Sequence, residues 1–192
     1  ASELMPNLAE ILETEYKEGN LCFDCLRWEN DPHWKELLTY NLSLFTYNEC
    51  LKEIIARFKY RGDYLLAQVF NNDIRKKINQ EPFDLLVPIP LSEERLYERG
   101  FNQAEALITE AGLTAANILS RIHTEKQSKK SRTDRIHLSQ VFQILTQERM
   151  KIKGKSILLV DDIYTTGSTL RHAAKILHEH GVKKVASLTI AR

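Results

Sequence analysis

The chain has 192 residues, a length that suits one domain with an appended segment and lets a folded protein bury roughly two-thirds of its unfolded surface. Hydrophobic residues make up 43% and charged residues 28%, and no apolar run approaches the roughly 18 residues of a membrane-spanning helix, so the composition disfavours a membrane protein. A net charge of +1 excludes a protein that is strongly basic or strongly acidic as a whole.

The first 44 residues are expected to form an N-terminal appendage. Apolar residues recur at helical spacing from Leu4 to Leu12, and Gly19 stands where such a helix would end, which predicts a short amphipathic helix. This stretch is acidic and differs from a secretory signal peptide, which has a basic start and an apolar block, so we expect a cytoplasmic protein. The three cysteines are odd in number and do not make a disulfide framework, in agreement with a reducing compartment.

From residue 45 onward, segments with strand and helix patterns alternate. A short edge strand is expected at residues 45–47, followed by helices at 49–60 and about 64–78. Further strands are expected at 84–88, 118–122, 156–160 and 184–190 and further helices at 102–111 and 168–180, with a loop after residue 88 and an apolar segment at 141–144. The alternation predicts an α/β fold in which a mostly parallel sheet is flanked by helices, and we assign residues 45–192 to this domain.

The strongest functional signal is the stretch ILLVDDIYTTGST at residues 157–169. Asp161 and Asp162 stand at the carboxyl end of a predicted buried strand, which is where open α/β sheets bind ligands. The loop that follows offers backbone N–H groups, hydroxyls and a positive helix end, which suit a phosphate monoester; its residues are Thr165, Thr166, Gly167, Ser168 and Thr169. Carboxylates would repel a phosphate, so we expect the acid pair to face ribose hydroxyls, Mg²⁺ or both.

The same residues have a purely structural interpretation. An acid pair can open a turn, and a Thr/Ser cluster can cap a helix in any protein. The order of strand, acid pair and loop favours the ligand site. Two other phosphate motifs are excluded, because a Walker loop needs a lysine directly after its second glycine and the dinucleotide fingerprint needs three spaced glycines.

Two stretches resemble known families. ILLVDDIYTTGST closely resembles the phosphoribosyl pyrophosphate binding motif of type I phosphoribosyltransferases, and DLLVPIPLSEERLYERGFNQAEAL at residues 84–107 resembles part of the ComF competence family. Together the resemblances cover residues 45–192. They imply that the chain binds phosphoribosyl pyrophosphate with Mg²⁺, that Asp161 and Asp162 are the catalytic and metal-binding acids, and that Tyr164 belongs to the ligand loop.

The ComF resemblance also implies a site for the diphosphate. Four residues would start the pyrophosphate loop: Pro88, Ile89, Pro90 and Leu91. Arg95 and Arg99 could then meet the diphosphate, which carries most of the ligand's negative charge. The alternative is that both arginines cap or line a helix surface.

The basic segment at residues 121–140 would be a mobile hood over this site. Six bases stand against two acids in residues 121–137. The segment is similar to the family's Gln-x-x-Leu and later Arg pattern at Gln127 and Arg135, and Lys126 is expected to bind the ligand. It departs from that pattern at Lys130, where Leu is expected, and at Leu138, where Asn is expected. The base-binding side therefore stays open, as does the alternative of a solvated charged loop.

ComF proteins usually open with a cysteine finger that carries two or more Cys-x-x-Cys pairs. This chain has only Cys22 and Cys25 in that spacing, so the appendage resembles a truncated finger. A structural zinc site needs four ligands, and His33 and Cys50 would complete one only at irregular spacing. We therefore expect little or no zinc.

Three functions are compatible with these residues. The first is a phosphoribosyltransferase of unknown acceptor with a role in competence and DNA uptake, although the loop lacks an acid that could serve as general base. The second is a non-catalytic ligand-sensing or single-stranded-DNA-binding partner of the uptake machinery, beside a helicase-like protein. The third is a nucleotide-salvage phosphoribosyltransferase.

Overall fold

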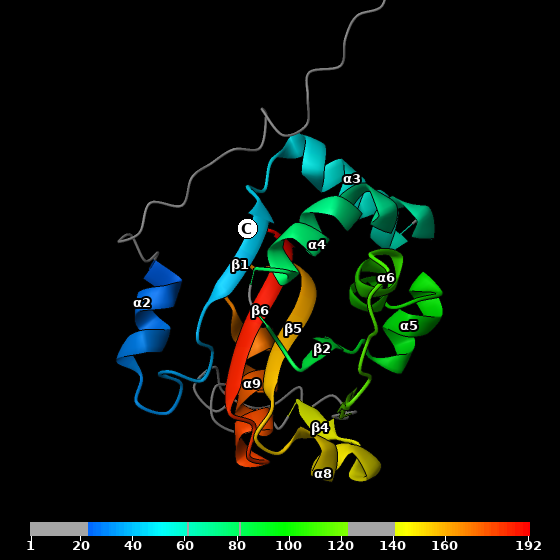
Figure 1. The fold of residues 1–192 in the computed structure, drawn as a ribbon. Helices are drawn as coiled ribbons and strands as arrows, with labels where there is room; N and C mark the ends of the chain where they lie inside the picture. The colour runs from blue at the N-terminus through cyan, green and yellow to red at the C-terminus, as the bar shows by residue number, and fades with distance from the viewer. Residues whose placement is uncertain (1–22, 61, 81, 123–140) are drawn as a thin grey trace, which may run out of the picture.

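The structure is a computed structural model that describes residues 23–60, 62–80, 82–122 and 141–192. Its centre is a four-stranded parallel sheet with the strand order β1-β6-β5-β2 (Figure 1). The strands are β1 (Asn41–Phe45), β2 (Leu85–Pro88), β5 (Ser156–Ile163) and β6 (Lys184–Ala191). Within the described residues, no helix combines the length and the apolar character needed to cross a membrane.

The central strands read as continuous apolar runs because both faces of the sheet are covered. In β5, every side chain from Ile157 to Val160 is at most 1% exposed. Successive residues alternate between two core clusters: Ile157 and Leu159 lie in one, and Leu158 and Val160 in the other. Burial on both faces therefore fixes the register of β5 against β2 and β6.

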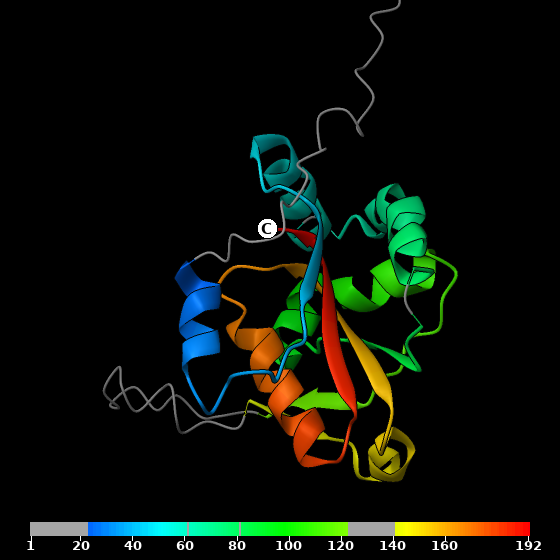
Figure 2. The same cartoon turned by 60° about the vertical axis from the view of Figure 1, so that its left-hand side comes forward.

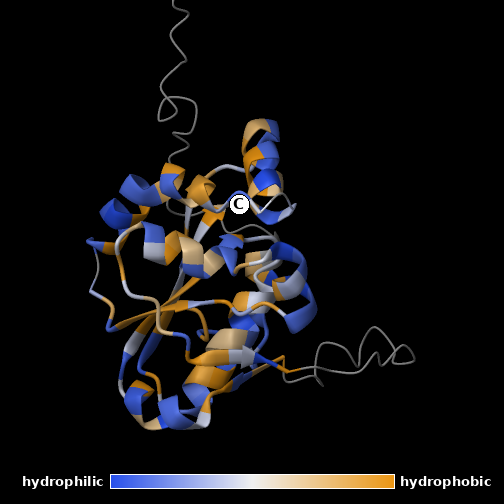
Figure 3. Cartoon of the chain, turned by 90° about the vertical axis from the view of Figure 1, so that its right-hand side faces the viewer, coloured by the Kyte–Doolittle hydropathy of each residue, from blue (hydrophilic) through white to orange (hydrophobic). Residues whose placement is uncertain are grey.

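Helices form a layer on each side of the sheet, as Figure 2 shows. One side carries α3 (Glu49–Tyr60), the 3-10 helix η1 (Tyr64–Phe70), α4 (Asn71–Ile78) and α6 (Gln103–Glu110). The other side carries α9 (Ser168–Glu179), with α2 (Phe23–Asn30) beside it (Figure 2). In Figure 3 the strands are mostly orange while the outer helices alternate between orange and blue, as expected for elements with one buried face.

A small second sheet lies below the main one in the view of Figure 1. It pairs β3 (Leu119–Arg121) with β4 (Phe142–Ile144) in antiparallel register, and it is followed by η2 (Thr146–Glu148) and α8 (Arg149–Ile152). The remaining element, α5 (Glu93–Arg99), follows β2. The mostly parallel sheet with flanking helices that the sequence predicts is therefore confirmed.

Several element predictions need correction. Residues 93–99 were expected in a loop but form α5, because the Ser92 hydroxyl caps the helix by accepting a hydrogen bond from Arg95 N–H (3.3 Å) and Gly100 ends it in the left-handed region (φ 78°). The edge strand expected at 45–47 is β1, which ends at residue 45. The helix expected at 64–78 is divided into η1 and α4.

The N-terminal part of the described chain is closely joined to the domain. β1 straddles the predicted boundary between residues 44 and 45 and pairs with β6. The helix α2 was not predicted from the sequence, and its Cys25 lies in the same core cluster as α9. The helix predicted between residues 4 and 12 and the hood segment at 123–140 lie outside the described residues.

Candidate functional site

The acid pair lies where β5 extends beyond its neighbour β2. Pairing between these strands ends at Pro88 and Val160, and the next two residues of β5 are Asp161 and Asp162. On its other side β5 remains paired with β6, with Asp161 opposite Thr189. Both acids are thus inside the strand, not after it, and they lie on a rigid edge at the carboxyl end of the sheet.

The two carboxylates have different environments. Asp162 is 9% exposed, and its Oδ2 lies 2.8 Å from Nζ of Lys59 in the last turn of α3. Asp161 accepts a hydrogen bond from the backbone N–H of Asp162 (2.9 Å). Burial, and secondly the charge of Asp162, raise the pKa of Asp161 from 3.8 to about 7. Asp161 is therefore partly protonated near neutral pH, a property common in functional sites.

Three cationic side chains, those of Lys59, Arg99 and Arg121, lie near this acid pair, and Arg95 lies near Arg121. The charges of Lys59 and Arg99 lower the pKa of Asp161, which partly offsets its burial. Burial lowers the pKa of Arg121, the charge of Arg95 lowers it further, and Asp161 raises it. The cations come from α3, α5 and β3, so helices and the small sheet together form a cluster of positive charge beside two acids.

Hydrogen bonds from neighbouring residues hold α5 and the predicted pyrophosphate loop in place. Arg99 donates a hydrogen bond from Nη1 to Oε1 of Gln103 (2.9 Å), and Gln103 is 1% exposed. Asn102 donates from Nδ2 to the carbonyl of Ile89 (3.0 Å) and so secures the predicted pyrophosphate loop. In that loop Pro88 and Ile89 are buried, whereas Pro90 and Leu91 are half-buried.

The predicted phosphate loop connects β5 to α9. Thr165, Thr166 and Thr169 are exposed and Ser168 is half-buried, so their hydroxyls face solvent or its margin. Gly167 is buried and has a φ of 75°, which glycine adopts without strain. A Cβ at this position would overlap the hydroxyl of Tyr164 and lie 2.7 Å from Nη1 of Arg171. Only glycine therefore fits the turn before α9.

The side chain of Tyr164 lies beneath the loop. It is 3% exposed, its hydroxyl accepts a hydrogen bond from Nη1 of Arg171 (2.8 Å), and it lies 3.6 Å from Sγ of Cys25. Burial, and secondly the contact with Cys25, raise the pKa of Tyr164, so the phenol stays neutral. Any contact of Tyr164 with a ligand would have to come from its backbone.

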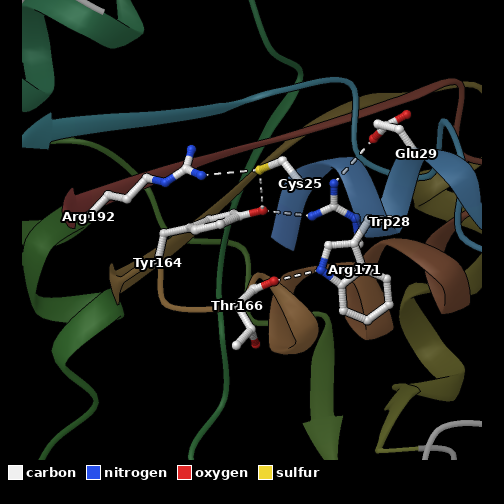
Figure 4. Close-up of polar contacts among 7 residues, drawn as sticks. All are labelled: Cys25, Trp28, Glu29, Tyr164, Thr166, Arg171 and Arg192. Carbon is white, nitrogen blue, oxygen red and sulfur yellow. Dashed lines mark hydrogen bonds and ion pairs between the residues drawn. The ribbon is translucent and has the colours of Figure 1, made fainter. Parts of the chain in front are cut away.

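The helix α2 packs directly against this loop (Figure 4). Trp28 donates a hydrogen bond from its indole nitrogen to the carbonyl of Thr166 (2.6 Å), and Glu29 forms an ion pair with Arg171 (3.3 Å). Arg192 at the end of the chain donates to the sulfur of Cys25 (3.2 Å). Residues far apart in the sequence thus meet under the loop.

The two carboxylates of the acid pair are suited to bind one Mg²⁺ ion together. Carboxylate oxygens are ligands that Mg²⁺ prefers, and this ion commonly takes one or two carboxylates while substrate phosphates and water complete its shell. In the part of the chain that the structure describes, no group of three or more His, Cys, Asp and Glu side chains could enclose a metal by itself. Mg²⁺ would therefore need a phosphate-bearing ligand beside the acids. Cys22 of the predicted cysteine pair is outside the described residues.

Sequence reasoning missed several residues of this site. Lys59 was assigned only to a helix, although it lies next to the buried Phe58 and so on the flank of the apolar stripe. Arg121 falls both in the strand expected at 118–122 and at the start of the predicted hood; it lies in β3, and its place beside the acids was not predicted. Lys126 falls outside the described residues, so its predicted contact stays a prediction.

Comparisons with known proteins show which family the chain resembles. Residues 96–192 match the family model described as the phosphoribosyl transferase domain. The chain is 41% identical over 176 residues to competence protein ComFC of Bacillus subtilis (strain 168), a match that covers 90% of this chain and 72% of that protein. It is 34% identical over 186 residues to competence protein ComFC of Streptococcus pneumoniae (strain ATCC BAA-255 / R6), with 97% and 80% covered.

The solved structures give a weaker likeness. Glutamine phosphoribosylpyrophosphate amidotransferase from B. subtilis, complexed with ADP and GMP, is 18% identical with a TM-score of 0.45, and the match covers 70% of this chain and 30% of that chain.

Proposed function

Because the chain belongs to the ComF family of competence proteins and contains a phosphoribosyltransferase domain, we propose that it binds phosphoribosyl pyrophosphate with Mg²⁺ at the carboxyl end of β5. The observation that supports this most is the acid pair, which has the glycine loop of α9 after it and three cations near it. A ligand with a phosphate, a diol and a diphosphate needs these three kinds of partner.

Each part of the site has a role in this proposal. The backbone and hydroxyls of Thr165 to Thr169 bind the 5-phosphate, and the acid pair accepts hydrogen bonds from the ribose hydroxyls. Arg95, Arg99 and Arg121 stabilise the diphosphate. When bound, Mg²⁺ would supply further positive charge to the departing pyrophosphate.

Transfer would follow from this charge stabilisation. A nitrogen nucleophile attacks the anomeric carbon, the bond from that carbon to the pyrophosphate oxygen breaks with its electron pair leaving on pyrophosphate, and the proton of the nitrogen passes to solvent water. The cations lower the energy of that developing charge. The phosphate loop offers Tyr164, Thr165 and Thr166 and no acid as a general base, so the proposal of turnover is separate from that of binding.

Two measurements separate binding from turnover. Calorimetric titration with phosphoribosyl pyrophosphate and Mg²⁺ tests binding, and saturable heat is expected. Incubation with the same ligand and a panel of purine and pyrimidine bases, while pyrophosphate release is followed, tests transfer and identifies the acceptor. Binding without base-dependent release would leave the ligand proposal intact and contradict transfer.

A second candidate is a non-catalytic module that binds single-stranded DNA in competence. Tyr97 is 91% exposed on α5, the helix that also carries Arg95 and Arg99, and exposed aromatic rings beside cations suit stacked bases and a phosphate backbone. Fluorescence anisotropy with a labelled oligonucleotide tests it. An affinity that falls with salt and with Tyr97→Ala supports this function, and no binding at low salt contradicts it.

The cellular compartment and the partner of the protein are also proposals. Cytoplasmic action suits the odd cysteine count and a ligand of metabolism. The competence relatives favour a partner in DNA uptake, and a helicase-like protein is our hypothesis for it. A nucleotide-salvage enzyme would instead show rapid turnover with one common base.

A further inference from the structure

A second layer of residues lies under the phosphate loop, and it comes largely from α2. The backbone of Thr166 contacts Trp28, and the side chain of Arg171 contacts both Tyr164 and Glu29 (Figure 4). None of these side chains belongs to the loop surface that would meet a ligand, since Tyr164 and Arg171 are 3% and 4% exposed. They nevertheless contact the loop directly, at the carbonyl of Thr166 and the hydroxyl of Tyr164.

Trp28 fixes the orientation of one peptide group. In a trans peptide the carbonyl of one residue and the N–H of the next point in opposite directions. The indole of Trp28 holds the carbonyl of Thr166 toward α2 at 2.6 Å, so the N–H of Gly167 is directed away from α2. The exposed side chains of Thr165 and Thr166 mark the solvent side of the same loop. A phosphate at that side would meet an N–H that is already oriented.

Arg171 adds a buried charge beneath the same loop. It lies at the end of the first turn of α9, where the helix dipole disfavours a cation. Its guanidinium donates to the hydroxyl of Tyr164 and forms an ion pair with Glu29 at 3.3 Å. Within the described residues its buried Nε has no hydrogen-bond partner. A buried cation in this position is stabilised by a nearby anion, and a phosphate on the loop would supply one.

We propose that α2 completes the phosphate subsite: Trp28 is a positioning residue that orients the Thr166–Gly167 peptide, and Arg171, balanced by Glu29, sets the positive charge beneath it. The proposal rests on the proposed binding of the 5-phosphate at this loop. It makes the segment before the sheet part of the ligand site, although no side chain of α2 touches the ligand.

Trp34 provides a matched control. The chain has two tryptophans, and Trp34 is buried in the same N-terminal segment, 5.3 Å from Trp28 between ring centroids. Its ring packs against His172 of α9 (4.7 Å), and within the described residues its indole nitrogen has no hydrogen-bond partner. Trp34→Phe therefore removes similar ring area, including packing against Trp28, but no hydrogen bond to the loop.

The test measures the affinity for ribose 5-phosphate and for inorganic phosphate by calorimetry. Trp28→Phe should weaken both about fivefold, as expected for loss of one hydrogen bond that holds the loop, and Trp34→Phe should leave both unchanged. Glu29→Gln should tighten both about twofold to fourfold at low salt, because it leaves the charge of Arg171 less compensated. A merely structural ion pair would give the opposite sign.

The possible results separate failure of the role of α2 from failure of the proposed function. If the wild type binds ribose 5-phosphate but Trp28→Phe binds equally well, or Glu29→Gln binds more weakly, the role of α2 is wrong while the proposed function stands. If the wild type shows no saturable binding, the proposed function fails and this inference fails with it.

An NMR measurement on the wild type covers the case in which a variant does not fold. Two indole N–H signals are expected, and ribose 5-phosphate should shift that of Trp28 and leave that of Trp34 in place. No shift of the Trp28 signal at saturating ligand would overturn the proposal.

Discussion

Replacing Asp161 with asparagine should stabilise the fold, and by more at high pH than at low pH. Asp161 is half-buried, and this burial together with the charge of Asp162 raises its pKa from 3.8 to about 7. Because the folded-state pKa lies above that of the unfolded chain, the folded protein binds a proton more tightly. The stabilisation that comes from protonated Asp161 is therefore fully present below about pH 4, and it is lost as the pH rises to 7.

The size of this effect follows from the pKa difference. A shift of one pKa unit is worth about 1.4 kcal/mol, so ionisation of Asp161 should cost about 4 kcal/mol at pH 8 and about 2 kcal/mol at pH 5. Asparagine keeps the oxygen that accepts from the N–H of residue 162 and has no charge to desolvate. For a chain of this size, about 2–4 °C per kcal/mol gives a gain in melting temperature of roughly 8–16 °C at pH 8 and half of that at pH 5.

Thermal denaturation followed by circular dichroism at pH 5 and pH 8 measures this difference. Asp84→Asn is the control with the opposite trend. Hydrogen bonds from the Ser156 N–H and from Lys155 lower the pKa of Asp84, so the ionised carboxylate stabilises the fold above about pH 4. This variant should therefore lose more stability at pH 8 than at pH 4. An Asp161→Asn variant that is less stable than the wild type at pH 8, or whose gain is the same at both pH values, would refute the reasoning.

Three further predictions concern the same edge of the sheet and the metal content. Asp162→Asn should destabilise the fold by about 1–3 kcal/mol in urea denaturation, because it leaves the largely buried ammonium of Lys59 without its carboxylate; a stability equal to wild type would contradict this. Gly167→Val should abolish binding of sulfate and of ribose 5-phosphate in calorimetry, whereas the double asparagine variant of the acid pair should lose ribose 5-phosphate and keep sulfate; the reverse pattern would contradict our division between loop and acids. Metal analysis of the purified protein should find little or no zinc, and one zinc per chain would overturn that expectation.

The sequence predicted the sheet and the position of the acid pair at its carboxyl edge well, because both depend on local patterns. The run from Ile157 to Val160 is apolar throughout, and it forms the buried strand that the pattern indicates. The glycine in the loop after it was predicted from a motif, and its backbone conformation explains why no other residue fits. The helix α5 had a local signal as well, since Ser92 precedes two acids in the manner of a helix cap.

The rest of the site depends on contacts between distant segments. Lys59 and Asp162 are 103 positions apart in the sequence, and no periodicity indicates that they form an ion pair. The contact of Trp28 with the carbonyl of Thr166 likewise joins residues 138 positions apart. Tyr164 belongs to the motif, yet its burial is set by Cys25 and Arg171 rather than by its neighbours in the sequence.

The central claim is that the carboxyl edge of β5 binds phosphoribosyl pyrophosphate, and a melting-temperature titration with Mg²⁺ tests it most directly. A ligand that binds only the folded state at 100 times its Kd stabilises that state by about 2.7 kcal/mol, which corresponds to a rise of roughly 5–11 °C. We predict such a rise for the wild type and none for Gly167→Val. No rise at millimolar ligand and Mg²⁺, in wild-type protein shown to be folded, would contradict the account.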